Sequence, residues 1–214
     1  MDALTQMLCG QIHMREYITL LKHDESLQKQ LRTLVPEEAR YNRGCPLWKS
    51  ISYDTFEYCN FDLFCVLEHL FKFDGSIGDN LNIHSIISGV YVFCNPKISV
   101  TTLYHDSFNL LLDVAGECFG GPEVDGLIDA VICKALEKYR TKKDRRQYAK
   151  GQIRELFHVE KNKLPCWIHG PEWPMGCNSP MKYISTHKNK DREGKVFVFQ
   201  DVDTGEIRQV VEMY

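Results

Sequence analysis

The chain has 214 residues, of which 43% are hydrophobic and 26% charged, and its formal net charge is −3. These values are typical of a folded globular protein, and they exclude a chain that is disordered or collagen-like throughout. No apolar run reaches the roughly 18 residues that a membrane-spanning helix needs. The first residues also lack the basic and apolar regions of an export signal, so we expect a cytoplasmic protein.

The charges divide the chain into three segments. Residues 1–133 carry nine basic and eighteen acidic residues, which is a net charge of −9. Residues 134–154 carry nine basic and two acidic residues, a net charge of +7, whereas residues 155–214 are close to neutral. The sequence therefore predicts an acidic body, a basic helix and a C-terminal module of little net charge.

Helical periodicity dominates the first segment. We expect residues 1–13 to be a frayed extension, because polar residues interrupt them and Met14 resembles a second start. Apolar residues spaced by three and four over 17–35 predict a helix or a helix pair. Turn residues predict a loop over 74–80. The apolar, β-branched run over 83–93 is compatible with either a helix or a strand.

Two further helices are expected before the basic segment ends. Apolar spacing predicts one over 103–119, which Gly120, Gly121 and Pro122 end, and another over 123–139. The basic residues 134–154 are expected to form a basic helix that continues or breaks before Ile153.

The C-terminal segment has the pattern of strands. Residues 181–185, 195–200 and 207–212 read as strands, with a turn at 203–206. The fold class expected is α+β, with a mainly helical N-terminal body over 1–160 and a small antiparallel β meander over 161–214. Three short strands need a partner surface. Either Trp167 and Trp173 cover one face of this meander or the meander docks on the helical body; for the two tryptophans a place in the core is favoured over a contact surface.

The nine cysteines follow no metal-binding or disulfide pattern. Their number is odd and no Cys-x-x-Cys pair occurs, so we expect reduced, buried thiols. His-Glu-x-x-His, a phosphate-binding Gly-rich loop and Gly-x-Ser-x-Gly are also absent. The spacing of Asp201, Asp203 and Gly205 fits a hairpin turn better than a calcium loop. No metal, no cofactor and no catalytic residue is therefore predicted, and the protein is expected not to be an enzyme.

The C-terminal segment resembles a β module of bacterial proteins linked with polymorphic-toxin immunity. The motifs that carry the resemblance are Pro-Cys-Trp-Ile at 165–168, Glu-Trp-Pro at 172–174, Ser-Pro-Met-Lys-Tyr-Ile at 179–184 and Gln-Asp-Val-Asp-Thr-Gly-Glu at 200–206. The resemblance covers about the last 50 residues. It implies a non-enzymatic protein that neutralises a toxin by direct binding.

An immunity protein covers its toxin, often a basic nuclease, with an acidic surface, and the acidic body suits that role. The residues expected to contact such a protein partner are Asp54, Glu57, Tyr58, Asp62, Asp74 and Asp79.

Two alternatives stay open. The basic segment is compatible with nucleic-acid binding, for which the expected contacts are Lys142, Lys143, Arg145 and Arg146. A solvated helix, or a helix docked onto the protein's own acidic body, is the more ordinary interpretation of the same segment. An enzyme with an active site that no motif marks is the third possibility.

Overall fold

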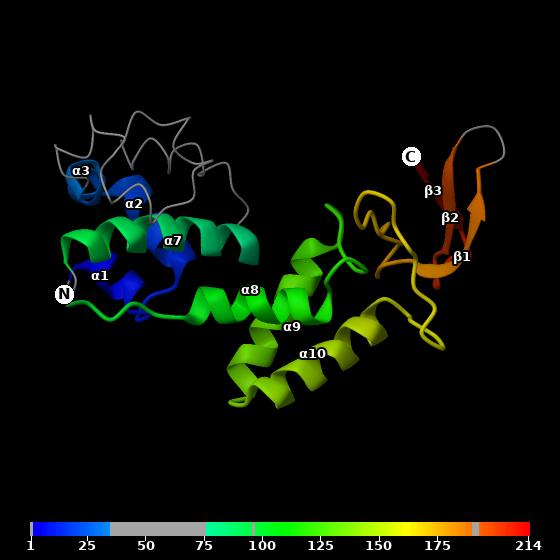
Figure 1. Ribbon diagram of the computed structural model, residues 1–214, viewed down its shortest axis with the longest axis horizontal. Helices are drawn as coiled ribbons and strands as arrows, with labels where there is room; N and C mark the ends of the chain where they lie inside the picture. Colours follow the sequence, from blue (N-terminus) through cyan, green and yellow to red (C-terminus); the bar gives the residue numbers. More distant parts are fainter. Residues whose placement is uncertain (1, 35–75, 96, 190–192) are drawn as a thin grey trace. The chain divides into compact units, whose positions relative to one another are not determined.

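The computed structural model describes residues 2–34, 76–95, 97–189 and 193–214. Within these residues the chain forms seven helices and one three-stranded antiparallel sheet, which confirms the α+β class (Figure 1). The chain divides into two compact units, residues 1–106 and 107–214. This division falls within helix α8 (Leu103–Val114), so residue 160, where the sequence placed a boundary, lies inside the second unit.

The first unit begins with a helix that the sequence analysis did not predict. Helix α1 (Ala3–Leu8) is capped by Asp2, whose carboxylate accepts a hydrogen bond from the main-chain N–H of Thr5 at 2.9 Å. Leu4, Met7 and Leu8 are fully buried. The expectation that residues 1–13 form a frayed extension is therefore wrong, because one face of α1 belongs to the hydrophobic core.

The helix pair predicted over 17–35 is confirmed. It consists of α2 (Met14–His23) and α3 (Glu25–Leu34), which are separated by Asp24. Asp24 accepts hydrogen bonds from the main-chain N–H groups of Ser26 and Leu27, as an N-cap residue does.

Helix α7 (Ile77–Cys94) settles the ambiguous run over 83–93 as a helix. It also shows that the predicted loop over 74–80 is wrong from residue 77 onward. Ser76 caps the helix: its hydroxyl accepts from the main-chain N–H of Asp79 and donates to the Asp79 carboxylate at 3.0 Å. Gly78 and Asn80 are residue types that favour loops, but here they lie in the first helical turn of α7, which Ser76 caps.

The core of the first unit encloses a histidine. His84 is 1% exposed, and its ring centroid lies 4.6 Å from that of Tyr104. Neither ring nitrogen has a hydrogen-bond partner among the described residues. Burial lowers the pKa of His84 to about 4; the main chain of Leu8 opposes this shift and the charge of His105 adds to it.

We expect the buried His84 to make the first unit sensitive to mild acid. The ring has a pKa of about 4 in the folded chain and about 6.5 in the unfolded chain, so the unfolded chain takes up the proton first as the pH falls. The free energy of unfolding is therefore at its full value above pH 6.5 and decreases as the pH falls from 6.5 toward 4. The free energy of unfolding should fall by about 2 kcal/mol between pH 7.5 and 5 on this account. Denaturant titrations of the full chain at both pH values measure it.

The variant His84→Phe should lose most of this pH dependence, because it keeps an aromatic ring but cannot take up a proton. His23→Gln, which changes an exposed histidine of α2, is the matched control and should keep it. An equal pH dependence in His84→Phe and the wild type would contradict the assignment.

In the second unit the basic segment forms two helices rather than one. Helix α9 (Asp125–Lys138) ends before Tyr139, and α10 (Lys142–Leu156) begins after Thr141. Of the two possibilities left open by the sequence over 134–154, a helix that continues or one that breaks, the structure shows the break, and the helix expected over 123–139 is confirmed. The helix predicted over 103–119 exists as α8 but ends earlier, at Val114.

The three predicted strands form the predicted meander. They are β1 (Lys182–Lys188), β2 (Gly194–Gln200) and β3 (Ile207–Met213), all antiparallel, in the order β1-β2-β3. Phe197 on β2 faces Thr186 on one side and Val210 on the other. The turn before β3 is held by Asp201, which is 4% exposed and accepts hydrogen bonds from the main chain of Asp203 and Thr204.

Aromatic residues cover one face of this sheet; of the two tryptophans, Trp173 is buried, whereas Trp167 is half-buried with its ring 4.6 Å from that of Phe197. Trp173 is 1% exposed, and its indole N–H donates to the carbonyl of Met181 at 2.6 Å. Its ring lies 5.4 Å from Phe119, 4.8 Å from Phe157 and 5.4 Å from Phe199. Trp173 therefore joins the end of α10 to the sheet.

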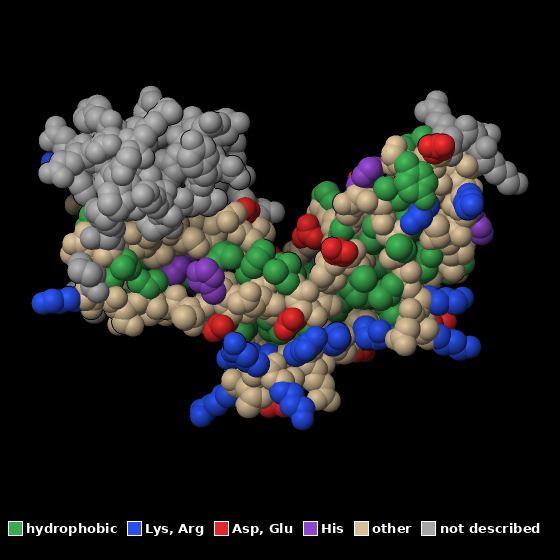
Figure 2. All heavy atoms as spheres, viewed as in Figure 1, with side chains coloured by type: hydrophobic (Ala, Val, Ile, Leu, Met, Phe, Trp, Pro, Cys, Tyr) green, Lys and Arg blue, Asp and Glu red, His purple; other side chains and the backbone are tan. Residues whose placement is uncertain are grey.

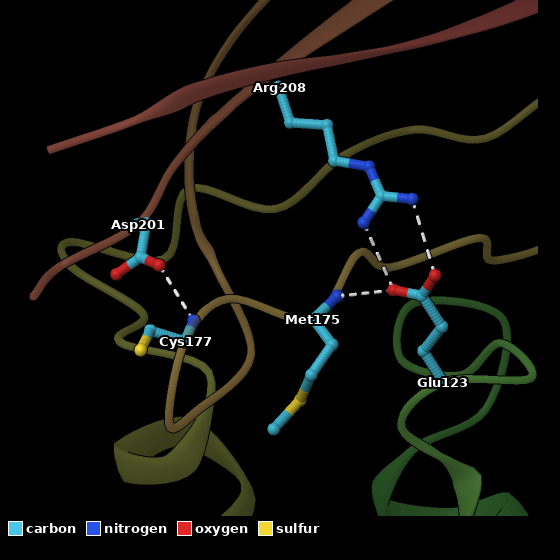
Figure 3. Close-up of polar contacts among 5 residues, drawn as sticks. All are labelled: Glu123, Met175, Cys177, Asp201 and Arg208. Atoms are coloured by element: carbon cyan, nitrogen blue, oxygen red, sulfur yellow. Dashed lines mark hydrogen bonds and ion pairs between the residues drawn. The ribbon is translucent and has the colours of Figure 1, made fainter. Parts of the chain in front are cut away.

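A second contact between the helices and the sheet is ionic. Arg208 of β3 forms a two-point ion pair with Glu123, just before α9, and the same carboxylate accepts from the main-chain N–H of Met175 at 2.8 Å (Figure 3). These hydrogen bonds lower the pKa of Glu123, that from Met175 most strongly. On the other side of the same loop, Asp201 accepts from the main-chain N–H of Cys177 at 2.7 Å.

The cysteines differ from the prediction of buried thiols. Six of the nine lie among the described residues as free thiols, and none of these six is buried: Cys9 and Cys118 are half-buried, and Cys94, Cys133, Cys166 and Cys177 are exposed.

Candidate nucleic-acid interface

Helices α9 and α10 form a paired scaffold for the basic residues. Ile128, Ile132 and Ala135 are buried on α9, and Ala149 and Ile153 are buried on α10. On each helix these residues recur at spacings of three and four, so each presents one apolar stripe to the core. Most of the remaining residues of α10 are polar or charged, whereas α9 also carries the half-buried Leu127, Val131 and Leu136.

The connection between the two helices is short and tied by side chains. Thr141 caps α10: its hydroxyl accepts from the main-chain N–H of Asp144 at 3.1 Å and donates to the Asp144 carboxylate at 2.7 Å. The guanidinium of Arg145 donates to the carbonyl of Tyr139 at 2.7 Å. Arg145 thus satisfies a carbonyl just past the end of α9, which would otherwise need another partner.

The basic residues between 134 and 154 gather on this helix pair, here called the basic hairpin. Figure 2 shows Lys and Arg side chains concentrated over α9 and α10. Seven of the nine cations are exposed, namely Lys134, Lys138, Arg140, Lys142, Lys143, Arg146 and Lys150. Arg145 and Arg154 are half-buried.

Four of the six cations of α10 share one flank of the helix. With 100° between successive residues, Lys143, Arg146, Lys150 and Arg154 fall within a sector of about 80° and extend along about 16 Å of the helix. These four residues are called the cationic flank. The other flank carries Asp144, Tyr148, Gln152 and Glu155, and Gln152 donates to Glu155 at 3.1 Å.

The cationic flank is not neutralised by neighbouring carboxylates. Among the described residues of the second unit the ion pairs are Lys182 with Glu160 and Arg208 with Glu123, and neither includes a residue of α9 or α10. Arg154 donates to the side-chain carbonyl of Asn162 at 2.7 Å, which orients the guanidinium and leaves its charge in place. The flank therefore presents net positive charge to solvent.

Two tyrosine rings, one between α9 and α10 and one on α10, pack together beside Lys138. The rings of Tyr139 and Tyr148 lie 5.1 Å apart, and the ammonium of Lys138 lies 5.4 and 5.2 Å from their centroids. Cations over aromatic faces at this distance are attracted by the ring electrons. Lys138 is thereby held at the end of α9 next to Tyr148 of α10.

Of the four predicted nucleic-acid contacts, Lys142, Lys143 and Arg146 are exposed as the prediction requires. Arg145 has a structural role instead, because its guanidinium is bound to Tyr139. Lys138 lies on α9 and not on the helix that carries these four residues. Lys150 and Arg154 were not among the predicted contacts. Their spacing from Lys143 places them on the same side of the helix once α10 is known to begin at residue 142.

Most of the residues predicted to contact a protein partner lie outside the part of the chain that the structure describes. Asp54, Glu57, Tyr58, Asp62 and Asp74 lie outside the described residues. Asp79 is described, and its carboxylate accepts from Ser76 in the cap of α7. Asp79 therefore has a structural role whether or not it also contacts a partner.

Among the described residues, two serine hydroxyls lie within hydrogen-bond distance of a histidine ring: Ser185 lies 2.9 Å from His187, both on strand β1, and Ser179 lies close to His158. The ring of His158 lies 3.0 Å from the Ser179 hydroxyl, and no third group orients that ring among the described residues. Their interaction fastens the end of α10 to the loop before β1. No three His, Cys, Asp or Glu side chains within the described part of the chain are placed to hold a metal ion.

Comparison of the chain with protein-family models, with curated proteins and with solved structures finds no match in any of the three. In the described ranges, no helix is both long and apolar enough to cross a membrane.

We expect that a substitution at Gly151 can stabilise α10, the helix that carries the cationic flank. This glycine lies on the exposed surface of α10, and an added methyl group would meet no atom within 4 Å. Gly151→Ala should therefore raise the free energy of unfolding by about 0.5–1 kcal/mol, because alanine favours the helix. Thermal or denaturant unfolding of the full chain measures the change.

The matched control is Gly121→Ala, which should destabilise the protein. Gly121 has a φ of +131°, and its added methyl group would lie 3.0 Å from the main-chain nitrogen of Trp173. A loss of stability in Gly151→Ala would mean that α10 is not helical at this position.

Proposed function

We propose that this chain is a non-enzymatic binding protein and that its basic hairpin binds the phosphate backbone of nucleic acid. The observation that carries the proposal is the cationic flank, where four basic side chains follow one side of a capped helix without an acidic partner in the described second unit. Binding of such a row to a polyanion releases condensed counterions, which is the main source of sequence-independent affinity.

The fixed geometry of the hairpin favours binding. The cap at Thr141 and the contact between Arg145 and Tyr139 hold the first turn of α10 in place before any ligand arrives. Less conformational entropy is therefore lost on association. Because lysine and arginine on a helix flank contact phosphates rather than base edges, we expect little preference for sequence.

The distribution of charge also favours this site. Residues 1–133 carry a net charge of −9, so they repel a polyanion, whereas residues 134–154 carry +7. A polyanion that approaches the chain is accordingly directed to the basic hairpin. The proposal places the protein in the cytoplasm, where nucleic acid is accessible.

Neutralising the flank should weaken binding and flatten its salt dependence. In the triple variant Lys143→Gln, Arg146→Gln and Lys150→Gln, the slope of log affinity against log salt should fall by about one for each lost cation. Fluorescence anisotropy with a labelled mixed-sequence oligonucleotide, single- and double-stranded, measures both the affinity and the slope.

The matched control removes the same charge elsewhere. Lys29, Lys163 and Lys188 are exposed lysines outside the basic hairpin, and their triple substitution by glutamine gives the same net charge. It should leave the affinity nearly unchanged. Equal losses in the two triple variants, or no salt-dependent binding by the wild type, would refute the proposed site.

A second proposal rests on the acidic segment and on the resemblance of the C-terminal module. The net charge of −9 over residues 1–133 suits capture of a basic protein, such as the nuclease domain of a toxin. Under this proposal the chain is an immunity protein, and Asp54, Glu57 and Asp62 belong to its contact surface.

Affinity capture from the cells of origin, with and without nuclease, separates the two proposals. An immunity protein should retain one stoichiometric protein partner after nuclease treatment, and reversal of Asp54, Glu57 and Asp62 to lysine should weaken that complex without unfolding the chain. Unchanged affinity after the reversal would remove this placement of the contact. A capture that consists of nucleic acid and disappears with nuclease would support the basic hairpin.

A further inference from the structure

Strand β3 is at one edge of the sheet, and its pairing shows which of its main-chain groups face outward. Two hydrogen bonds beyond the strand ends, from Asp201 N–H to Glu206 O and from Tyr214 N–H to Glu193 O, belong to the same register as β2 and β3. In an antiparallel ladder bonded pairs alternate with non-bonded ones. Even-numbered residues of β3 therefore bond to β2, and residues 207, 209 and 211 direct their N–H and C=O groups away from the sheet.

This outer edge is open over most of its length. Ile207 and Val211 are 53% and 52% exposed. Within the described part of the chain, no group is hydrogen-bonded to the main chain of residues 207, 209 or 211. The end of the edge is different, because the carbonyl of Met213 lies 2.6 Å from the ring nitrogen of His169. Three consecutive outward-facing positions thus lack main-chain partners.

The opposite edge of the same sheet is protected. Strand β1 has an irregular register between Tyr183 and Ser185, and it has a lysine at each end, Lys182 and Lys188. Bulges and lysines are the usual means by which edge strands avoid pairing with other chains. Strand β3 pairs with β2 in unbroken register and carries no lysine.

We propose that β3 pairs antiparallel with β3 of a second copy of this chain, about a two-fold axis at Gln209. In this register Gln209 faces its own counterpart, and Ile207 faces Val211 of the other copy in both directions. Each facing pair exchanges two main-chain hydrogen bonds, because all three positions direct these groups outward. The edge is self-complementary, as an isologous interface requires.

The alternative register, with the axis at Val210, is less favourable. It would place residue 207 opposite residue 213, and the carbonyl of Met213 is already in contact with His169. The axis at Gln209 pairs the outward groups of residues 207, 209 and 211 with one another and uses no main-chain group that is already bonded. It also brings the exposed side chains of Ile207 and Val211 together on the outer face of the sheet, where apolar cross-strand pairs stabilise the ladder.

The test is the self-association of the full chain, measured by sedimentation or by light scattering over a range of concentrations. We expect a concentration-dependent dimer that Gln209→Pro weakens on the order of tenfold or more. Proline removes the outward N–H of residue 209 and leaves the ladder with β2 complete, because that ladder uses the N–H groups of the even-numbered residues. Val202→Lys, a change at an exposed residue outside the strand, is the control and should keep the dimer.

A pair of charge variants tests the register. Ile207→Lys and Val211→Glu should each weaken the homodimer, because a charged residue then faces an apolar one in both pairs. A mixture of the two variants should associate more tightly than either alone, since Lys at 207 of one copy then faces Glu at 211 of the other.

Each outcome decides the proposal. The proposal is supported if the wild type dimerises, if Gln209→Pro and each charge variant weaken the dimer, and if mixing the two charge variants restores association. A wild-type chain that stays monomeric at its highest soluble concentration, or a dimer indifferent to these changes, would overturn it. Circular dichroism of each variant confirms that the sheet is retained. Because self-association is measured without nucleic acid, the result is independent of the proposed function.

Discussion

The burial of Trp173 is the interaction on which the second unit depends. Its ring contacts Phe119 after α8, Phe157 at the end of α10 and Phe199 on β2, so one side chain joins three parts of the chain. A three-stranded sheet is marginal without a covered face. The same cluster that stabilises the sheet also fixes the end of α10, and hence the direction in which the cationic flank faces.

Helices and strands were predictable where a single spacing of apolar residues continues over a long segment. Alternating apolar residues marked β2, and spacings of three and four marked α9. The failures occurred where local signals were short or ambiguous. Helix α1 has six residues, too few to show a period, and the residues that begin α7 are equally suited to a turn. A break within 134–154 was left open but could not be placed at 139–141, because charged and apolar residues continue across these positions at helical spacing.

The candidate site was only partly predictable, because its geometry depends on where α10 begins. The excess of positive charge over 134–154 is visible in the sequence, and it drew attention to Lys143 and Arg146. Sequence does not show that Arg145 turns back to the carbonyl of Tyr139. Once Thr141 is known to be the cap, helical geometry alone separates the cationic flank from the side that carries Asp144 and Glu155.

The hairpin and the free edge of β3 lie in the same unit, and together they have a consequence for affinity. A dimer formed through β3 carries two cationic flanks in fixed relation to each other. When one flank is bound, the second meets the same polyanion at a high effective concentration, provided that the ligand spans both. Weak phosphate contacts on a single helix would then combine into firm binding without any base-specific contact, and the number of neutralised phosphates would double.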